Sequence, residues 1–69
     1  MRVKVLKLGH STRESEVPAG SNVQNVLDKV DFDPAGYSVT INGLGASLSA
    51  AVSDGDIVTL VPKVEGGRL

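Results

Sequence analysis

Two adjacent glycines near the C-terminal end, Gly66 and Gly67, are the residues of this 69-residue chain best suited to take part in chemistry. Glycine has no Cβ and adopts a wide range of backbone angles. A chain end made of glycines can therefore enter a narrow channel of another protein that side chains would block. Glycines near a terminus also occur as plain flexible ends, so their position alone leaves both interpretations open.

The rest of the chain offers little catalytic chemistry of its own. The absence of cysteine excludes a disulfide scaffold, a thiolate metal site and a cysteine nucleophile. His10 is the only histidine and lies in a predicted turn, without an evident nucleophile or orienting partner. Asp54 and Asp56 lack the run of oxygen ligands of a calcium loop and are expected to be turn residues. We therefore expect a protein that is not an enzyme and that holds no metal or permanently bound cofactor.

Length and charge restrict the classes of partner. A chain of this length forms one small domain with a modest core. The net charge is −1, and the positive and negative residues are interspersed, so no basic patch favours nucleic acid. No apolar run is long enough for a signal peptide or a membrane span. We expect a cytoplasmic protein that acts on neither membranes nor nucleic acid.

Hydrophobic periodicity predicts an α+β fold. Alternating apolar residues predict strands at residues 2–8, 12–17, 37–41 and 57–64, with the Asn42–Gly43 pair as a tight turn. Residues 44–52 are expected to form a short strand or loop and then one turn of helix. In the last strand Val58 and Leu60 should face the core, and Pro62 should end the pairing.

One amphipathic helix of about three turns is predicted between the second and third strands. Ser21 is expected to be its N-cap, with Gln24 at the spacing of a capping box. The apolar stripe that should face the core consists of Val23, Val26, Leu27 and Val30.

The first and last strands are apolar enough to lie side by side at the centre of the sheet. A parallel pair of this kind needs a long crossover, which the helical region supplies. The expected architecture is a mixed sheet of four to five strands with one main helix across one face. We expect this domain to span residues 1–64 and to be followed by a flexible tail at residues 65–69.

The chain resembles the ubiquitin-like β-grasp superfamily. The segments that carry the resemblance are residues 1–5, 16–27 and 54–58 and the ending 60–67, which reads Leu-Val-Pro-Lys-Val-Glu-Gly-Gly. Within the superfamily the chain is similar to the sulfur carriers of molybdopterin and thiamine synthesis (the MoaD/ThiS type) and to prokaryotic ubiquitin-like proteins with a C-terminal diglycine.

The resemblance implies chemistry at the chain end. An E1-like adenylating partner would use ATP and Mg to activate the Gly67 carboxylate, with Gly66 beside it. A sulfur donor or acceptor enzyme, or lysines of target proteins, would then receive the activated end. The chain departs from the carrier pattern because Arg68 and Leu69 follow the glycines. A processing protease that cuts between Gly67 and Arg68 is therefore expected.

The resemblance also implies two partner-binding surfaces. The segment that leads to the glycines consists of Val61, Pro62, Lys63, Val64 and Glu65. The second surface is the outer face of the sheet, with Thr40, Thr59 and Leu8. This face is expected to be poor in large apolar residues.

Three hypotheses follow for the function. The chain is a sulfur carrier that bears a thiocarboxylate at Gly67, or a modifier that becomes joined to protein lysines. Alternatively, it is a non-conjugated β-grasp interaction module that binds a partner through its sheet or an edge strand, and whose tail has no role.

Overall fold

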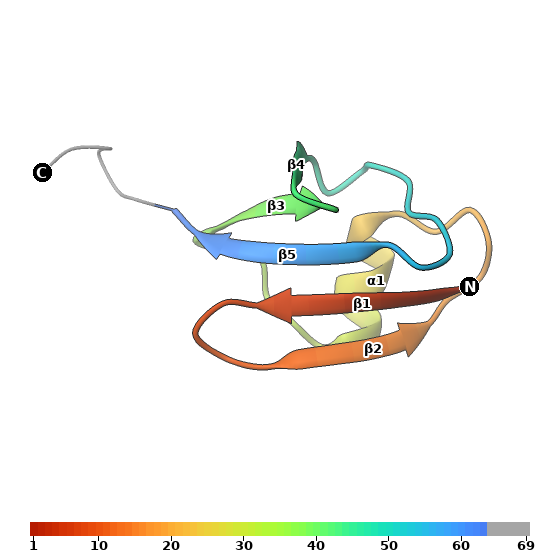
Figure 1. Cartoon of the computed structure of the whole chain (residues 1–69), viewed down its shortest axis with the longest axis horizontal. Coiled ribbons are helices and arrows are strands. Elements are labelled where there is room, and N and C mark those ends of the chain that lie inside the picture. Colours follow the sequence, from red (N-terminus) through yellow and green to blue (C-terminus); the bar gives the residue numbers. More distant parts are fainter. Residues whose placement is uncertain (64–69) are drawn as a thin grey trace, which may run out of the picture.

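The computed structural model describes residues 1–63 and shows a five-stranded sheet with one helix (Figure 1). The elements are β1 (Arg2–Lys7), β2 (Thr12–Glu16), α1 (Val23–Val30), β3 (Tyr37–Ile41), β4 (Leu44–Ala46) and β5 (Ile57–Pro62). The predicted flexible tail at residues 65–69 lies outside the described residues. The domain boundary at residue 64 stays a prediction.

The strands lie in the order β2-β1-β5-β3-β4, so the first and last strands are neighbours at the centre (Figure 1). They run parallel, with Lys4 opposite Ile57 and Lys7 opposite Leu60. The other pairs are antiparallel. This arrangement confirms the predicted central parallel pair and the mixed sheet.

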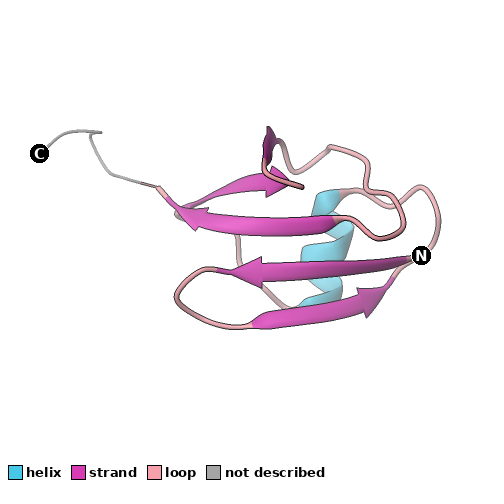
Figure 2. Ribbon diagram, viewed as in Figure 1, coloured by secondary structure: helices cyan, strands magenta, loops and turns pink. Residues whose placement is uncertain are grey.

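A tight turn joins β3 to β4 at Asn42 and Gly43, as predicted. Both residues have positive φ, 53° and 87°, which is the backbone geometry of a two-residue hairpin turn. β4 has only three residues, and no helix follows it in the described chain (Figure 2). The predicted turn of helix within residues 44–52 was wrong. An isolated bridge between Asn22 and Ala51 holds this segment against the start of α1 instead.

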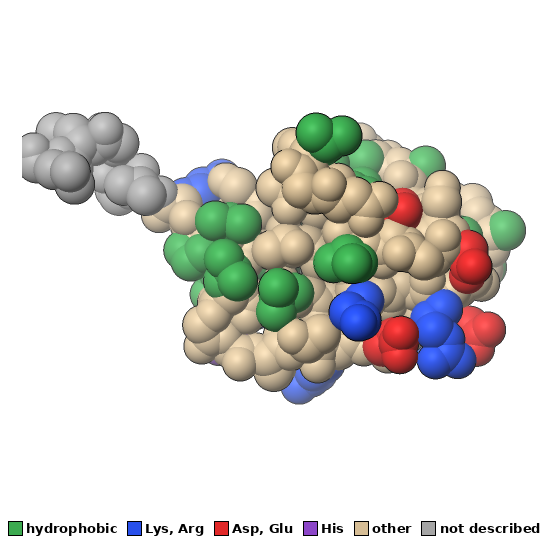
Figure 3. All heavy atoms as spheres, in the orientation of Figure 1, with side chains coloured by type: hydrophobic (Ala, Val, Ile, Leu, Met, Phe, Trp, Pro, Cys, Tyr) green, Lys and Arg blue, Asp and Glu red, His purple; other side chains and the backbone are tan. Residues whose placement is uncertain are grey.

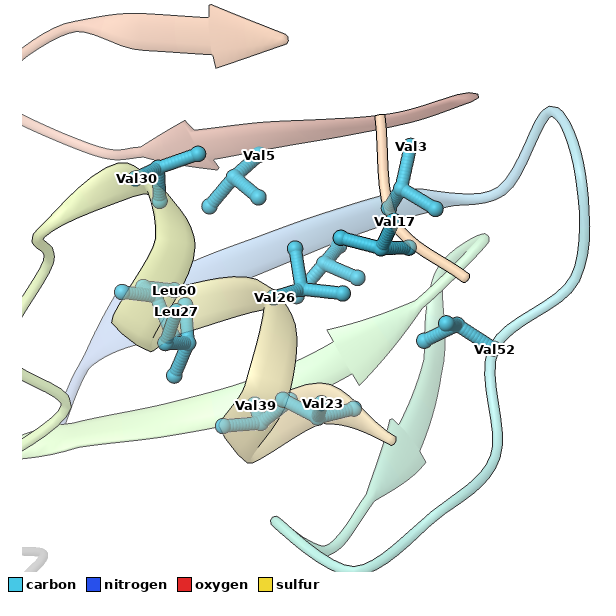
Figure 4. Packing of buried hydrophobic residues seen from close by; sticks show 11 residues of the cluster. Val3, Val5, Val17, Val23, Val26, Leu27, Val30, Val39, Val52 and Leu60 are labelled. Atoms are coloured by element: carbon cyan, nitrogen blue, oxygen red, sulfur yellow. The ribbon is translucent and has the colours of Figure 1, made fainter. Parts of the chain in front are cut away.

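The core lies between α1 and one face of the sheet (Figure 4). The apolar stripe of α1 is buried as predicted, and β1 and β5 contribute their inward residues. The buried hydrophobic residues are Val3, Val5, Val17, Val23, Val26, Leu27, Val30, Val39, Val52, Val58 and Leu60. Because these residues are aliphatic and of similar size, the core depends on close packing of valines and leucines.

The start of α1 differs from the prediction by one residue. Asn22 is the N-cap, and its side chain accepts a hydrogen bond from the Asn25 backbone N–H at 2.9 Å. The Asn25 side chain accepts one from the Asn22 N–H at 3.0 Å, which completes a capping box. The Ser21 hydroxyl instead donates to the Pro18 carbonyl at 2.7 Å and is nearly buried.

The helix is also shorter than predicted, with eight residues, or just over two turns. It ends at Val30, because the C-cap residue Asp31 has a left-handed backbone (φ 63°) that stops further helical bonding. The strands likewise end one or two residues before the predicted limits, at Lys7, Glu16 and Pro62.

Candidate docking face at the end of β5

The end of β5 fixes the point from which the chain continues toward the glycines. Val61 lies opposite Ser38, and Pro62 lies opposite Tyr37. Pairing extends one residue beyond the proline, because the Lys63 N–H donates to the Gly36 carbonyl at 3.0 Å. Three members of the predicted tail segment, Val61 to Lys63, are therefore held by the sheet rather than free from Pro62 onward.

The remaining predicted tail and reaction residues lie outside the described part of the chain. They are Val64, Glu65, Gly66, Gly67 and Arg68. Their proposed roles stay predictions.

The face of the sheet opposite α1 carries the second predicted surface. Val58 and Leu60 point to the core, so the intervening Thr59 and Val61 lie on the outer face. Thr40 lies opposite Thr59, and its hydroxyl donates to the Thr59 carbonyl at 3.4 Å. The backbone of Leu8 is attached next to them, since its N–H donates to the Leu60 carbonyl at 3.1 Å.

This outer face carries large apolar side chains, contrary to the prediction. The register of β1 against β5 aligns Leu6 with Thr59, and the strand alternation puts Leu8 beside Val61 and Ile57 beside Lys4. Leu8 and Ile57 are 40% and 43% exposed. Apolar side chains gather where β1 and β5 end, next to the point where the chain leaves the sheet (Figure 3).

Leu6 and Ile57 are the residues that sequence reasoning missed at this site. The alternation within each strand already placed both on the outer side. What the alternation could not supply was the register between strands about fifty positions apart in the chain, which brings the two strands' apolar residues together. We call Leu6, Leu8, Ile57 and Val61 the outer patch.

Charge is concentrated at the opposite end of the same face (Figure 3). Arg2 and Glu14 form an ion pair at 3.4 Å, and both side chains are exposed. Such exposed pairs contribute little to stability. The outer face is therefore charged near the start of β1 and most apolar near the ends of β1 and β5, with Ile57 between the two regions, beside Lys4.

A cluster of cations and aromatic rings lies on the helix side of the sheet, at the end from which β5 leaves. The Lys7 ammonium lies 4.9 Å from the Tyr37 ring centroid and 5.6 Å from that of Phe32. The Arg13 guanidinium lies 4.9 Å from the Phe32 centroid. His10 Nε2 is 3.1 Å from the Tyr37 hydroxyl, so the histidine belongs to this cluster. We call these residues the cation–aromatic cluster.

No group of three His, Asp or Glu side chains in residues 1–63 could hold a metal ion. A shallow groove of about 640 Å³ beside β3 and β4 is lined by Pro34, Val39, Ala46 and Leu48 among others, with Asp33 and Lys63 as its charged residues. Within the described chain no helix has the length and apolarity needed to cross a membrane.

Comparisons with solved structures show the fold. SAMP1 from Haloferax volcanii aligns with a TM-score of 0.78 at 22% identity, over 97% of this chain and 100% of that one. A chain in the complex of subunits 1 and 2 of the molybdopterin-converting factor from Helicobacter pylori aligns with a TM-score of 0.71 at 18% identity. The alignment covers 97% of this chain and 100% of that one. The ubiquitin of Caldiarchaeum subterraneum aligns at 0.68 and 27% identity, over 97% and 98%. These likenesses confirm the predicted β-grasp fold.

A search among curated proteins found no significant match. The sequence profile of the ThiS family, in contrast, matches residues 4–67, which include nearly all of the described domain and both glycines. Proteins of this type are small carriers or ubiquitin-like modifiers, and they are not themselves enzymes. The chain belongs to the ThiS family and is a ubiquitin-like β-grasp protein.

Proposed function

We propose that this protein is a sulfur carrier whose Gly67 carboxylate is activated by a partner adenylating enzyme, after removal of the residues that follow Gly67. One observation carries the proposal: the ThiS family match includes all five strands, apart from the first two residues of β1, and ends at residue 67, the second glycine. Arg68 and Leu69 lie beyond the match, which supports cleavage between Gly67 and Arg68.

The proposed reaction has two steps, and the partner enzyme supplies the ATP and Mg. A carboxylate oxygen of Gly67 attacks the α-phosphorus of ATP, and pyrophosphate leaves. A sulfur donor at the oxidation level of sulfide then forms a C–S bond at the acyl carbon, and AMP leaves as the C–O bond breaks. The product is a thiocarboxylate, and the second step involves no net oxidation or reduction.

The described residues would provide a docking surface for the partner and would set the direction in which the chain end leaves the sheet. The outer patch supplies an apolar area that extends along β1 and β5 to the end of β5, and the centres of protein interfaces are commonly apolar. The bond from Lys63 to Gly36 fixes where the chain leaves the sheet. The Helicobacter structure is a complex of two subunits, so a protein of this fold has been observed bound to a protein partner.

A second candidate is a protein modifier, which the 27% identity to an archaeal ubiquitin favours. The first step would be the same. A lysine amine of a target would then form a C–N bond at the acyl carbon, lose a proton and displace AMP. Activation at one end would thus serve either function.

The intact mass of the protein purified from its native cells tests the proposal. A chain that ends at Gly67 with one carboxyl oxygen replaced by sulfur is the expected result. A chain that ends at Gly67 without sulfur, together with lysine-linked adducts, would favour the modifier. Chains that all keep Arg68 and form no adducts would contradict both candidates and favour the non-conjugated module.

A matched pair of variants separates the chain end from the fold. A chain that ends at Gly66 should lose activation, because its carboxylate is one residue too short to reach the nucleotide. A chain that ends at Gly67 should be activated without prior cleavage. Both should unfold at the same temperature, since both contain all of residues 1–63. Equal activation of the two would contradict the assignment of Gly67.

A further inference from the structure

Two dipeptides in the chain, Asn42–Gly43 and Asp54–Gly55, place a side-chain carbonyl directly before a glycine. In such a pair the glycine nitrogen can attack the side-chain carbonyl carbon and close a five-membered ring. Glycine favours this attack because it has no side chain that hinders the approach. Water then opens the ring, so the residue before the glycine changes without an enzyme. The surroundings of the two pairs decide which of them reacts.

The nitrogen that would attack is engaged at one pair and not at the other. The Gly55 N–H donates to the Arg2 carbonyl at 2.8 Å, and Asp54 Oδ1 accepts from the Arg2 N–H at 2.8 Å. The Gly43 N–H has no hydrogen-bond acceptor within residues 1–63. Asn42 and Gly43 are both exposed, so water reaches them. Asn42–Gly43 is therefore the pair that is open to the reaction.

The other two asparagines of the chain, Asn22 and Asn25, are poorly placed for the same chemistry. Each precedes a valine, whose branched side chain hinders approach to its own nitrogen. The Val23 and Val26 N–H groups also donate to the carbonyls of Ala50 and Asn22, at 3.0 and 3.2 Å. These two asparagines serve as internal controls for Asn42.

Two hydrogen bonds hold the Asn42 side chain against the start of β5. Asn42 Oδ1 accepts from the Ile57 N–H at 2.9 Å, and Asn42 Nδ2 donates to Asp56 Oδ1 at 3.1 Å. The Asn42 N–H also donates to the Ile57 carbonyl at 2.8 Å, so this residue anchors the β3–β4 hairpin to β5. The side chain has to leave both partners before its carbonyl carbon can meet the Gly43 nitrogen. The two bonds therefore slow the ring closure.

We propose that Asn42 is a site of spontaneous deamidation in the folded protein, and that its hydrogen bonds to Ile57 and Asp56 control the rate. The Gly43 nitrogen loses its proton to water or hydroxide and forms a bond to Asn42 Cγ. The Cγ–Nδ2 bond breaks, and the nitrogen leaves with a proton as ammonia. Water then adds to either carbonyl of the ring and breaks one C–N bond, which leaves aspartate or isoaspartate at position 42. No atom changes its oxidation state.

Either product weakens the link between the hairpin and β5. The donor that Asp56 accepts is replaced by a second carboxylate, and like charges side by side destabilise a sheet. Isoaspartate also adds a carbon to the main chain of a two-residue turn whose geometry is specific. The change occurs beside Ile57 of the outer patch. The site goes beyond the proposed activation at Gly67 and does not depend on it.

Incubation of the folded full-length chain at neutral pH, followed by peptide mass spectrometry, tests the site. Asn42 should convert to the two acidic forms while Asn22 and Asn25 remain amides. Circular dichroism before and after the incubation shows that the chain is folded throughout. A rate at Asn42 that is no higher than the rates at Asn22 and Asn25 would overturn the proposal.

Asp56→Ser tests the control of the rate. It removes the oxygen that holds Asn42 Nδ2, while its hydroxyl can still accept from the Ser53 N–H, which the other carboxylate oxygen does at 2.7 Å. Conversion at Asn42 should become roughly fivefold faster. Asp33→Ser is the matched control, because Asp33 accepts from the Ala35 N–H at 2.9 Å in a different turn, and it should keep the wild-type rate. Equal rates in Asp56→Ser and the wild type would contradict the control of the rate by Asp56.

Asn42→Asp gives a second measurement that needs no incubation. This variant has the sequence of the aspartate product, and its melting temperature should lie roughly 4 °C below that of the wild type. An unchanged melting temperature would show that the contact between Asn42 and Asp56 does not hold the hairpin to β5. The part of the proposal that assigns rate control to this contact would then be wrong, whatever the result for Asp56→Ser.

Discussion

At the scale of single residues, Asn22 controls where α1 begins. Its side chain and that of Asn25 satisfy each other's backbone N–H groups, which would otherwise lack partners at the helix start. Asn22→Ala should lower the free energy of unfolding by about 1 kcal/mol, as measured by urea denaturation. Lys29→Ala, an exposed change within the same helix, should cost only a few tenths of that value. Equal losses for both variants would contradict the role of the cap.

The sequence could predict a cap near this position but not which residue provides it. Ser21 with Gln24 and Asn22 with Asn25 both satisfy the capping-box spacing, and both stand before the first buried valine. The choice depends on Pro18, whose carbonyl accepts the Ser21 hydroxyl in the preceding loop. That contact becomes visible only when the loop conformation is known.

At the scale of elements, the cation–aromatic cluster joins the β1–β2 hairpin to the segment that enters β3. Lys7 comes from β1, while Phe32 and Tyr37 come from the chain that follows α1. The ammonium is attracted to the two ring faces, and the rings cover part of the side chain. The cluster thus ties the β1–β2 hairpin to the segment that runs from α1 into β3, next to the end of β5.

Acylation of the lysines tests this cluster. With limiting N-hydroxysuccinimide acetate, Lys7 should react a few-fold more slowly than the exposed Lys4 and Lys29, as quantified by peptide mass spectrometry. Tyr37→Leu should raise the rate at Lys7 and leave the rates at the other two lysines unchanged. Equal rates at Lys4, Lys7 and Lys29 in the wild type would show that the rings do not cover the amine of Lys7.

The elements themselves were largely predictable, whereas their mutual register was not. The alternation in residues 2–8 and 57–64 and the stripe on α1 identify strands, helix and core, because burial of one face imposes a period on the sequence. The outer patch depends on which residue of β1 faces which residue of β5. No local pattern encodes that register, so the sequence does not show which apolar residues of the outer face lie side by side, although the alternation within β1 and β5 already places them on that face.

At the scale of the whole molecule, the outer face of the sheet is asymmetric, with apolar side chains near the ends of β1 and β5 and charged side chains near the start of β1. Leu8→Asp and Val61→Asp each place a carboxylate in the apolar part of the outer face. Docking of a partner there would remove the water around this charge, which costs free energy. Each should raise KM for the carrier at least about tenfold in ATP–pyrophosphate exchange, with kcat little changed. Lys29→Asp, on the exposed side of α1, is the control and should keep the wild-type KM.

Circular dichroism distinguishes lost docking from lost folding in these variants. Leu8 is 40% exposed and lies outside the buried core, so Leu8→Asp should keep a melting temperature within a few degrees of the wild type. A wild-type KM for both Leu8→Asp and Val61→Asp would show that the enzyme binds another face. The proposed role of the outer face would then be wrong, although activation at Gly67 would still hold.

The parallel pairing of β1 with β5 also sets an order of events during synthesis of the protein. The ribosome makes β1 first and β5 last, yet the two are neighbours at the centre of the sheet. Until β5 has emerged, β1 has an open edge and the core lacks Val58 and Leu60, so the domain cannot finish folding before β5 has left the ribosome. Gly66 and Gly67 come after β5 in the chain. A nascent chain interrupted before β5 therefore lacks both the complete core and the glycines, and any chain that offers the glycines to an activating enzyme already contains every strand of the sheet.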